Sequence, residues 1–287
     1  MNPILLVIPI LSVLMFDLGL TLRSEDFGRL LREPRAVFVG LAGQLVLLPA
    51  VAVALVGLVD MPVVFALGFV LIACCPGGSS SNVFSKLAGG DVALSVTLTA
   101  LSSVITLFTI PVVMQIAVKV LGAGVAESVE LPVWNLIIQN IVLMGVPIVL
   151  GFLVRSKWGG AAIRIDRVLS RCAFPALMLL AGLFFVQHRA TIGENMGGLG
   201  VVATLLIILA SALGLVLSLL FGLRKTQRRT IVIEVGMQNA AQAIAIATSP
   251  FVFSNEPMAI PAVIYALMMN VVLLTYVGVI RVRERRS

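Results

Sequence analysis

Oxygen-bearing side chains gather inside two apolar stretches, where their types and spacing suit a bound cation. Ser95, Thr99, Ser102 and Thr106 are spaced four, three and four residues apart, so a helix would place all four hydroxyls on one face. The run 76–82, which reads PGGSSSN, adds three serines and an asparagine shortly before them. Sodium, like other hard cations, prefers oxygen ligands. The alternative is structural, because Ser and Thr hydroxyls in membrane helices often bond to carbonyls of their own helix.

Two acidic residues lie well inside apolar stretches. A carboxylate within a membrane span indicates a functional site by default, because it is expensive to bury there. Glu234 is the stronger candidate, although it follows Arg229 by only five residues and is close enough to reach the inner interface instead. Asp17 precedes Arg23 by six residues. For Asp17 we favour a structural interpretation, in which it pairs with a basic neighbour or reaches toward the headgroups.

The elements that must position these residues are membrane-spanning helices. Of the 287 residues, 60% are hydrophobic and 11% are charged, whereas soluble domains carry about 25% charged residues. Crossing the hydrocarbon core takes about 20 helical residues. The stretches that are apolar over such a length are 3–22, 36–58, 62–85, 92–118, 132–154, 168–187, 199–223, 230–250 and 258–280. The sequence therefore predicts an all-α polytopic membrane protein with nine transmembrane helices, forming one domain over 1–287.

The basic residues are distributed unevenly between the two sides of these predicted helices. Eighteen of the twenty Lys and Arg residues fall on one side, and only Lys119 and Arg189 fall on the other. Cytoplasmic loops retain such residues. We therefore expect a cell (inner) membrane protein with its N-terminus outside and its C-terminus in the cytoplasm. No basic run is interleaved with aromatic residues, so the net charge of +7 predicts no nucleic-acid partner.

Two predicted helices are interrupted at matching places. The helix over 62–85 contains Pro76, Gly77 and Gly78, which favour unwinding, and the helix over 230–250 carries the polar cluster 234–239. The first four and last four helices form two sets of opposite orientation, and each interrupted helix is the third of its set. Such paired interruptions point to the binding site of a transporter built from an inverted repeat.

Residues typical of an enzyme or a transition-metal site are not grouped in the sequence. Cys74, Cys75 and Cys172 show no metal-ligand spacing, and His188 is the only histidine. No nucleophile with a base and no pair of catalytic carboxylates is evident. We therefore predict that the chain is not an enzyme, holds no metal other than sodium, and uses its cysteines as small apolar packing residues.

Four motifs closely resemble the bile acid:sodium symporter family. They are Met15–Arg23 with Asp26 and Phe27, Cys75–Asn82, Gly90–Thr99 and Glu234–Asn239. The resemblance covers nearly the whole chain, which looks like a nine-helix member lacking the first helix of ten-helix bacterial members. It implies a core of about 36–118 and 199–280, in which the two broken helices cross. It also implies a panel of about 3–22 and 132–187.

The same resemblance implies two sodium ions that share one carboxylate. The first site maps onto five side chains: Ser81, Asn82, Ser95, Thr99 and Glu234. The second maps onto three side chains and two backbone carbonyls: Gln44, Glu234 and Gln238, with Val235 and Met237. The substrate-facing polar positions map onto Ser79, Asn239 and Asn270.

The chain departs from the family pattern mainly around the substrate positions. Met269 stands where a histidine often occurs, and Ala240 and Ala241 replace a small polar pair. Asp17 stands where glycine is frequent. The resemblance therefore supports sodium as the coupling ion more firmly than it supports any particular class of substrate.

The resulting prediction is a sodium symporter that imports an organic anion by alternating access across the lipid bilayer. Bile acid-like, pantoate-like and keto acid carboxylates all suit the family, and helix N-termini at unwound points suit such anions. The alternative is a proton-coupled or uncoupled transporter or exporter of the same fold. A ligand-gated sensor would leave the same sequence pattern, and only transport assays separate it.

Overall fold

The computed structural model describes residues 4–22, 28, 32–78, 80–121, 133–187, 189–249 and 252–284. These residues are nearly all helical, and the described part of the chain contains no strand, only one isolated β-bridge. Its elements are α1 (Ile4–Thr21), α3 (Pro34–Ala42), η1 (Gly43–Leu47), α4 (Leu48–Leu58), α5 (Val63–Cys74), α6 (Ser81–Leu87), α7 (Val92–Leu121), α8 (Val133–Asn140), η2 (Ile141–Gly145), α9 (Val146–Lys157), α10 (Gly159–Gln187), α11 (Arg189–Leu220), α12 (Lys225–Gly236), α13 (Ala240–Thr248), η3 (Pro257–Ala259) and α14 (Ile260–Glu284).

Five of the described helical segments are long and apolar enough to cross a membrane. They are Pro34–Leu58, Val92–Leu121, Ile137–Lys157, Arg189–Leu220 and Pro257–Glu284. Pro9–Thr21 and Val63–Cys74 are shorter apolar helices. The chain is thus a multi-pass membrane protein, and the number of nine spans stays a prediction.

Three predicted helix starts are wrong in the same direction. α10 begins at Gly159, α11 at Arg189 and α12 at Lys225, whereas the apolar stretches begin at 168, 199 and 230. The extra turns carry basic residues such as Arg164 and Arg228. Hydropathy marks the hydrocarbon core of a bilayer, but a helix can continue into the headgroup region with polar side chains.

Short π-helical turns precede two of the internal prolines. η1 ends two residues before Pro49, and η2 ends two residues before Pro147. Proline lacks an N–H donor and crowds the preceding turn, and a widened turn accommodates both effects. Both prolines therefore follow a π turn, a feature that often occurs at functional sites. Pro111, by contrast, lies inside the continuous helix α7.

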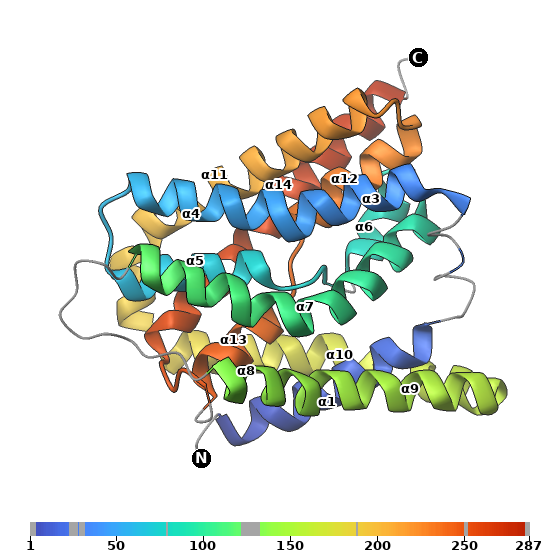
Figure 1. Ribbon diagram of the computed structural model, residues 1–287, viewed down its shortest axis with the longest axis horizontal. Helices are drawn as coiled ribbons and strands as arrows, with labels where there is room; N and C mark the ends of the chain where they lie inside the picture. The colour runs from blue at the N-terminus through green and yellow to red at the C-terminus, as the bar shows by residue number, and fades with distance from the viewer. Residues whose placement is uncertain are drawn as a thin grey trace.

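The helices form two layers in Figure 1. α1, α9 and α10 pack together in the lower part, and α3, α4, α11, α12 and α14 lie in the upper part, with α5, α6 and α7 between. α1 and α9 approach so closely that a Cβ on Gly151 would lie 2.8 Å from the backbone nitrogen of Leu20. The main apolar core includes Phe69 and Tyr265, and a smaller cluster around Leu11 and Leu107 joins the lower layer to α7.

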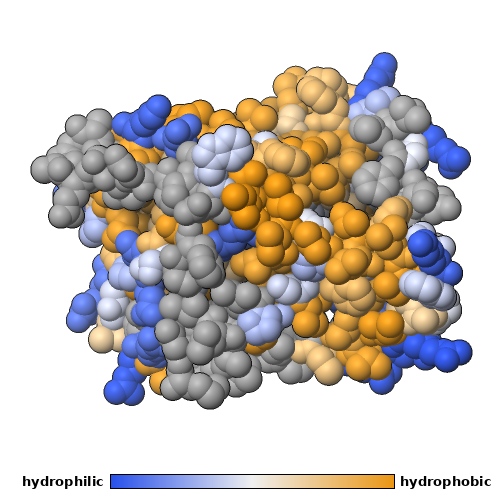
Figure 2. Space-filling model, turned by 60° about the horizontal axis from the view of Figure 1, so that its bottom comes forward, coloured by the Kyte–Doolittle hydropathy of each residue, from blue (hydrophilic) through white to orange (hydrophobic). Residues whose placement is uncertain are grey.

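Several helix ends with basic residues meet at one end of the molecule, which we call the basic end. Arg224 Nη2, just before α12, lies 2.7 Å from Oε1 of Glu33, which just precedes α3. Lys225 lies 3.7 Å from Glu284 at the end of α14. Figure 2 shows apolar residues across the middle of one face, with most strongly hydrophilic residues toward its left and right ends. This banding suits a protein that crosses a bilayer.

Candidate functional site

The two interrupted helices meet at their breaks. α5 ends at Cys74 and α6 begins at Ser81, while α12 ends at Gly236 and α13 begins at Ala240. The unwound backbones pair in antiparallel fashion: Gly78 N donates to Met237 O at 3.2 Å, and Asn239 N donates to Pro76 O at 2.9 Å. Both predicted interruptions are therefore present, and they cross each other.

The crossing leaves little room at Gly77. A Cβ there would lie 2.8 Å from Glu234 Oε2 and 3.0 Å from Gln44 Nε2, so these two side-chain ends would have to shift. Gly77 thus borders both predicted sodium sites.

Two residues for which the sequence suggested no role contact the other interrupted helix, near the end of α12. Tyr265 Oη donates to Gly236 O at 3.1 Å, and Ser211 Oγ donates to Val232 O at 3.2 Å. A tyrosine inside an apolar span was a usable signal, since its buried hydroxyl needs a partner.

The Glu234 carboxylate is fully buried among three hydroxyl groups. Ser81 Oγ of α6 donates to Oε1 at 2.6 Å, and Ser95 Oγ of α7 donates to the same oxygen. Thr99 Oγ1, also of α7, donates to Oε2 at 3.1 Å. Four of the five side chains predicted for the first sodium site are therefore in mutual contact, held by three helices.

The structural alternative for Glu234, a position at the inner interface beside Arg229, is wrong. Among the described residues, no ion pair includes Glu234, and Arg229 pairs with Glu284 at 2.6 Å. The fifth residue of the first set, Asn82, has its Oδ1 buried without a hydrogen-bond partner in the described structure. The site therefore combines one uncompensated carboxylate with spare oxygen atoms.

The second predicted set also gathers at the crossing, with its carbonyls already engaged. Gln238 Nε2 donates to Val235 O at 3.0 Å, and Met237 O accepts from Gly78 N. A carbonyl oxygen has two lone pairs, so each retains one for a cation. Gln44, in η1, is buried with neither polar atom of its amide partnered, and Gln238 Oε1 is likewise without a partner in the described structure. These orphaned oxygens fit a hard cation.

The four-hydroxyl face of α7 divides into two parts. Ser95 and Thr99 bind Glu234, as described above. Ser102 Oγ donates to Thr99 O and Thr106 Oγ1 donates to Ser103 O, both at 3.2 Å. The cation-binding interpretation is thus compatible with the first two residues, and the structural alternative is correct for the other two.

The predicted substrate positions are not brought together by any described contact. Asn239 caps α13, where its Oδ1 accepts from Gln242 N at 3.1 Å. Asn270 is exposed on α14 and donates to Ala266 O of its own helix at 2.7 Å. Ser79 lies outside the described residues. Gln242, to which the sequence assigned no role, is fully buried with neither polar amide atom partnered in the described structure.

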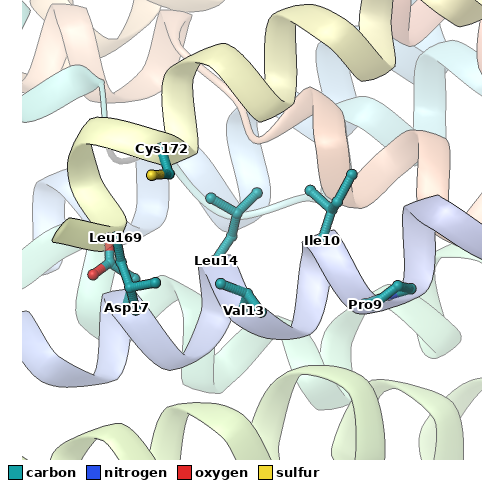
Figure 3. Close-up of a pocket in the computed structure, with 7 residues that line it drawn as sticks. All are labelled: Pro9, Ile10, Val13, Leu14, Asp17, Leu169 and Cys172. Carbon is teal, nitrogen blue, oxygen red and sulfur yellow. The ribbon is translucent and has the colours of Figure 1, made fainter. Parts of the chain in front are cut away.

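Asp17 lines a pocket of about 210 Å³ between α1 and α10, away from Glu234. The other lining residues, shown in Figure 3, are Pro9, Ile10, Val13, Leu14, Leu169 and Cys172. Asp17 Oδ1 is buried and has no hydrogen-bond partner among the described residues, and Asp166 is near enough for the two charges to interact. Arg23, the predicted basic neighbour, lies outside the described residues. The pairing of Asp17 with this neighbour therefore stays a prediction.

Comparison with known proteins places these features in context. The chain matches the family model described as the sodium bile acid symporter family over residues 8–195. It is 29% identical over 264 residues to the uncharacterized sodium-dependent transporter YocS of Bacillus subtilis (strain 168), covering 91% of this chain and 78% of the relative.

Two further relatives come from Oryza sativa subsp. japonica and Homo sapiens. The probable sodium/metabolite cotransporter BASS1, chloroplastic, of Oryza sativa subsp. japonica is 30% identical, over 91% of this chain and 62% of the relative. The ileal sodium/bile acid cotransporter of Homo sapiens is 28% identical, over 80% of this chain and 65% of the relative. The chain therefore spans less than two thirds of the rice and human proteins. All three relatives are named as transporters, in agreement with the prediction that this chain is not an enzyme.

Proposed function

Because the chain belongs to the sodium bile acid symporter family, we propose that it is a sodium-coupled symporter that imports an organic anion. The observation that carries this proposal is the fully buried Glu234 carboxylate, surrounded by hydroxyls from α6 and α7. A buried carboxylate is strongly unfavourable unless a cation compensates its charge or the group takes up a proton. A sodium ion bound beside Glu234 would supply that charge.

The proposed stoichiometry is two sodium ions at the crossing. The first would bind Ser81, Asn82, Ser95, Thr99 and Glu234. The second would bind Gln44, Glu234, Gln238 and the carbonyls of Val235 and Met237. A hydroxyl that donates its proton to Glu234 keeps two lone pairs, so one serine can serve the carboxylate and the cation at once.

The proposed cargo is a carboxylate or sulfonate with an apolar body. Bound sodium would hold the broken helices in the shape that presents Asn239 and the N-terminus of α13. A helix N-terminus carries partial positive charge and free N–H groups, which suit an anion. Bile acid-like, pantoate-like and keto acid carboxylates are the candidate classes, with Ser79 and Asn270 as further contacts.

Alternating access would result from movement of the core (about 36–118 and 199–280) against the panel (about 3–22 and 132–187), arranged as an inverted repeat. Away from the basic end, the two parts are joined by polar contacts. Ser249 Oγ, after α13, donates to Gln139 Oε1 of α8 at 2.8 Å, and Asn140 Nδ2 lies 3.5 Å from Leu107 O of α7. These contacts support a conformation closed on that side.

We place the basic end in the cytoplasm and the N-terminus outside, in the cell (inner) membrane. This orientation follows from the excess of Lys and Arg in the segments that meet there. An inside-negative membrane potential would then assist import, since two sodium ions with a monovalent anion carry net positive charge inward.

The decisive experiment is uptake of labelled bile acid, pantoate and keto acid into proteoliposomes. We expect an inward sodium gradient to drive accumulation of at least one of them, with an equimolar potassium gradient as the control. Equal uptake under both gradients would contradict sodium coupling. Accumulation driven by a pH gradient in sodium-free buffer would favour the proton-coupled alternative, in which Glu234 and Asp17 carry the proton.

A further inference from the structure

Arg229 is a buried cation at the basic end, and it connects three helices. It lies on α12 and is only 7% exposed. Its Nη1 donates to Ala88 O, just past the end of α6, at 2.9 Å. Its Nη2 donates to Glu284 Oε1 at the end of α14, at 2.6 Å. One planar guanidinium thus joins α6 and α12, each of which is one half of a broken helix, to α14.

The surrounding backbone is shaped to admit this side chain. Gly89 follows Ala88 with φ +63°, and a Cβ there would lie 3.0 Å from Arg229 Nη1. Next along the chain, Asp91 N donates to Thr230 Oγ1 at 2.8 Å, and Thr230 Oγ1 donates to Asp91 O at 3.1 Å. Arg281 Nε of α14 donates to Leu87 O at 3.0 Å. Two arginines, Arg229 and Arg281, therefore donate to the carbonyls at the C-terminal end of α6. Positive charge is favourable there because this end of a helix carries partial negative charge.

These contacts bear on the sodium site because α6 is short. Its first residue, Ser81, binds Glu234, and the carbonyl just past its end binds Arg229. Arg229 and Glu234 lie on the same helix, five residues apart, which is a rise of roughly 7–8 Å along the helix axis. α6 and α12 are thus tied to each other at both ends. We propose that Arg229, held by Glu284, is a positioning residue that sets sodium affinity by keeping Ser81 within reach of Glu234.

This inference rests on the proposed function and is tested with sodium alone. The measured quantity is the sodium concentration that gives half of the maximal thermal stabilisation of the purified protein, with potassium keeping ionic strength constant. We expect Arg229→Gln to raise this concentration about tenfold, equivalent to about 1.4 kcal/mol of binding free energy. Arg229→Lys should fall between Arg229→Gln and wild type, because an ammonium lacks the planar fork that reaches two acceptors.

Lys225→Gln is the matched control, since Lys225 is on the same helix, near the same Glu284, and its side chain is 74% exposed. It should leave the half-stabilising sodium concentration unchanged. Glu284→Gln should raise it in the same direction as Arg229→Gln, and it keeps the test decisive if Arg229→Gln fails to fold. A lowered melting temperature with an unchanged sodium requirement in these variants would make Arg229 merely structural and overturn the inference. A wild-type protein that does not respond to sodium would overturn the proposed function instead.

Discussion

Glu234 and Gln44 are both fully buried, yet the protein satisfies them differently. Glu234 accepts hydrogen bonds from three hydroxyls, whereas the polar amide atoms of Gln44 have no partner in the described structure. Leaving a buried polar group unsatisfied costs roughly 1–3 kcal/mol. Under the proposed function, a bound cation would reduce the penalty at both residues, so substitutions at each should alter the response to sodium.

Glu234→Gln keeps the shape of the side chain and removes its charge. We expect sodium-driven uptake to fall at least tenfold, since losing a charge-assisted contact costs about 1.5–3 kcal/mol and 1.4 kcal/mol corresponds to a factor of ten. The measurement is initial uptake under a fixed sodium gradient. Asp60→Asn, at an exposed position between α4 and α5, is the control and should transport normally. Retention of half the wild-type rate by Glu234→Gln would argue against its proposed role.

Gln44→Leu separates stability from sodium binding. The variant removes an unpartnered buried amide, so its melting temperature in potassium should equal or exceed that of wild type. Its stabilisation by sodium should shrink, because one proposed oxygen ligand is lost. Ser85→Ala is the matched control: Ser85 Oγ is also buried without a partner in the described structure, but it belongs to neither proposed site. An undiminished sodium shift in Gln44→Leu would remove Gln44 from the second site.

At the scale of elements, the crossing of the two broken helices determines which side chains meet. Neither half-helix could leave its last carbonyls and first N–H groups unpaired in a bilayer without a large penalty. The hydrogen bonds from Gly78 to Met237 and from Asn239 to Pro76 satisfy part of this requirement within the protein. The unwound segments are therefore stabilised by each other, and any side chain that separates them should disturb the whole site.

Gly77→Ala tests this dependence. The added Cβ would lie 2.8 Å from Glu234 Oε2, so the carboxylate or the backbone must shift. We expect a lower melting temperature together with a loss of the sodium-dependent shift. Gly57→Ala in α4 is the control, because a Cβ there meets nothing within 4 Å. That control should leave the melting temperature unchanged or raise it, given a helix preference for Ala over Gly of about 1 kcal/mol. A normal sodium shift in Gly77→Ala would contradict a tight crossing.

For the whole molecule, the contacts between the proposed core and panel have functional weight under the proposed mechanism. The small apolar cluster that includes Met15, Leu107 and Ala245 joins α1, α7 and α13. Ser249 and Gln139 add a buried hydrogen bond on the side away from the basic end. If the core and panel move against each other, this interface must open during each transport cycle.

Ser249→Ala should favour that opening. It removes the donor and leaves a buried Gln139 oxygen unsatisfied, which shifts the balance by roughly 1–3 kcal/mol. The reporter is Ala245→Cys, a buried position at the interface, in a chain whose exposed Cys172 is replaced by Ser. We expect its labelling by a membrane-impermeant thiol reagent to be several-fold faster when Ser249→Ala is added. Thr204→Ala, which removes a hydroxyl bonded within α11, should leave the rate unchanged. Equal labelling in both backgrounds would count against this interface as a gate.

The sequence was informative wherever the signal was local. Pro76 and Gly77 predicted one interruption, and the polar cluster beginning at Glu234 predicted the other. The motif resemblance then identified Ser81, Ser95 and Thr99 as partners of Glu234. The alternative that placed Glu234 at the interface beside Arg229 was wrong, because five residues along a helix are close in sequence but do not make the two side chains neighbours. In the structure Arg229 is bound to Ala88 and Glu284, 141 and 55 residues away.

The sequence by itself determined that the chain is helical, membrane-embedded and broken at two points, since apolar length, proline, glycine and buried polar residues act through local physical chemistry. Only the tertiary structure decided that Ser81 and Glu234, 153 residues apart, lie 2.6 Å from each other, and that Gln44 borders the same glycine. It also decided that two of the four α7 hydroxyls bond to their own helix. Such pairings depend on how all the helices pack at once, and no local pattern specifies that packing.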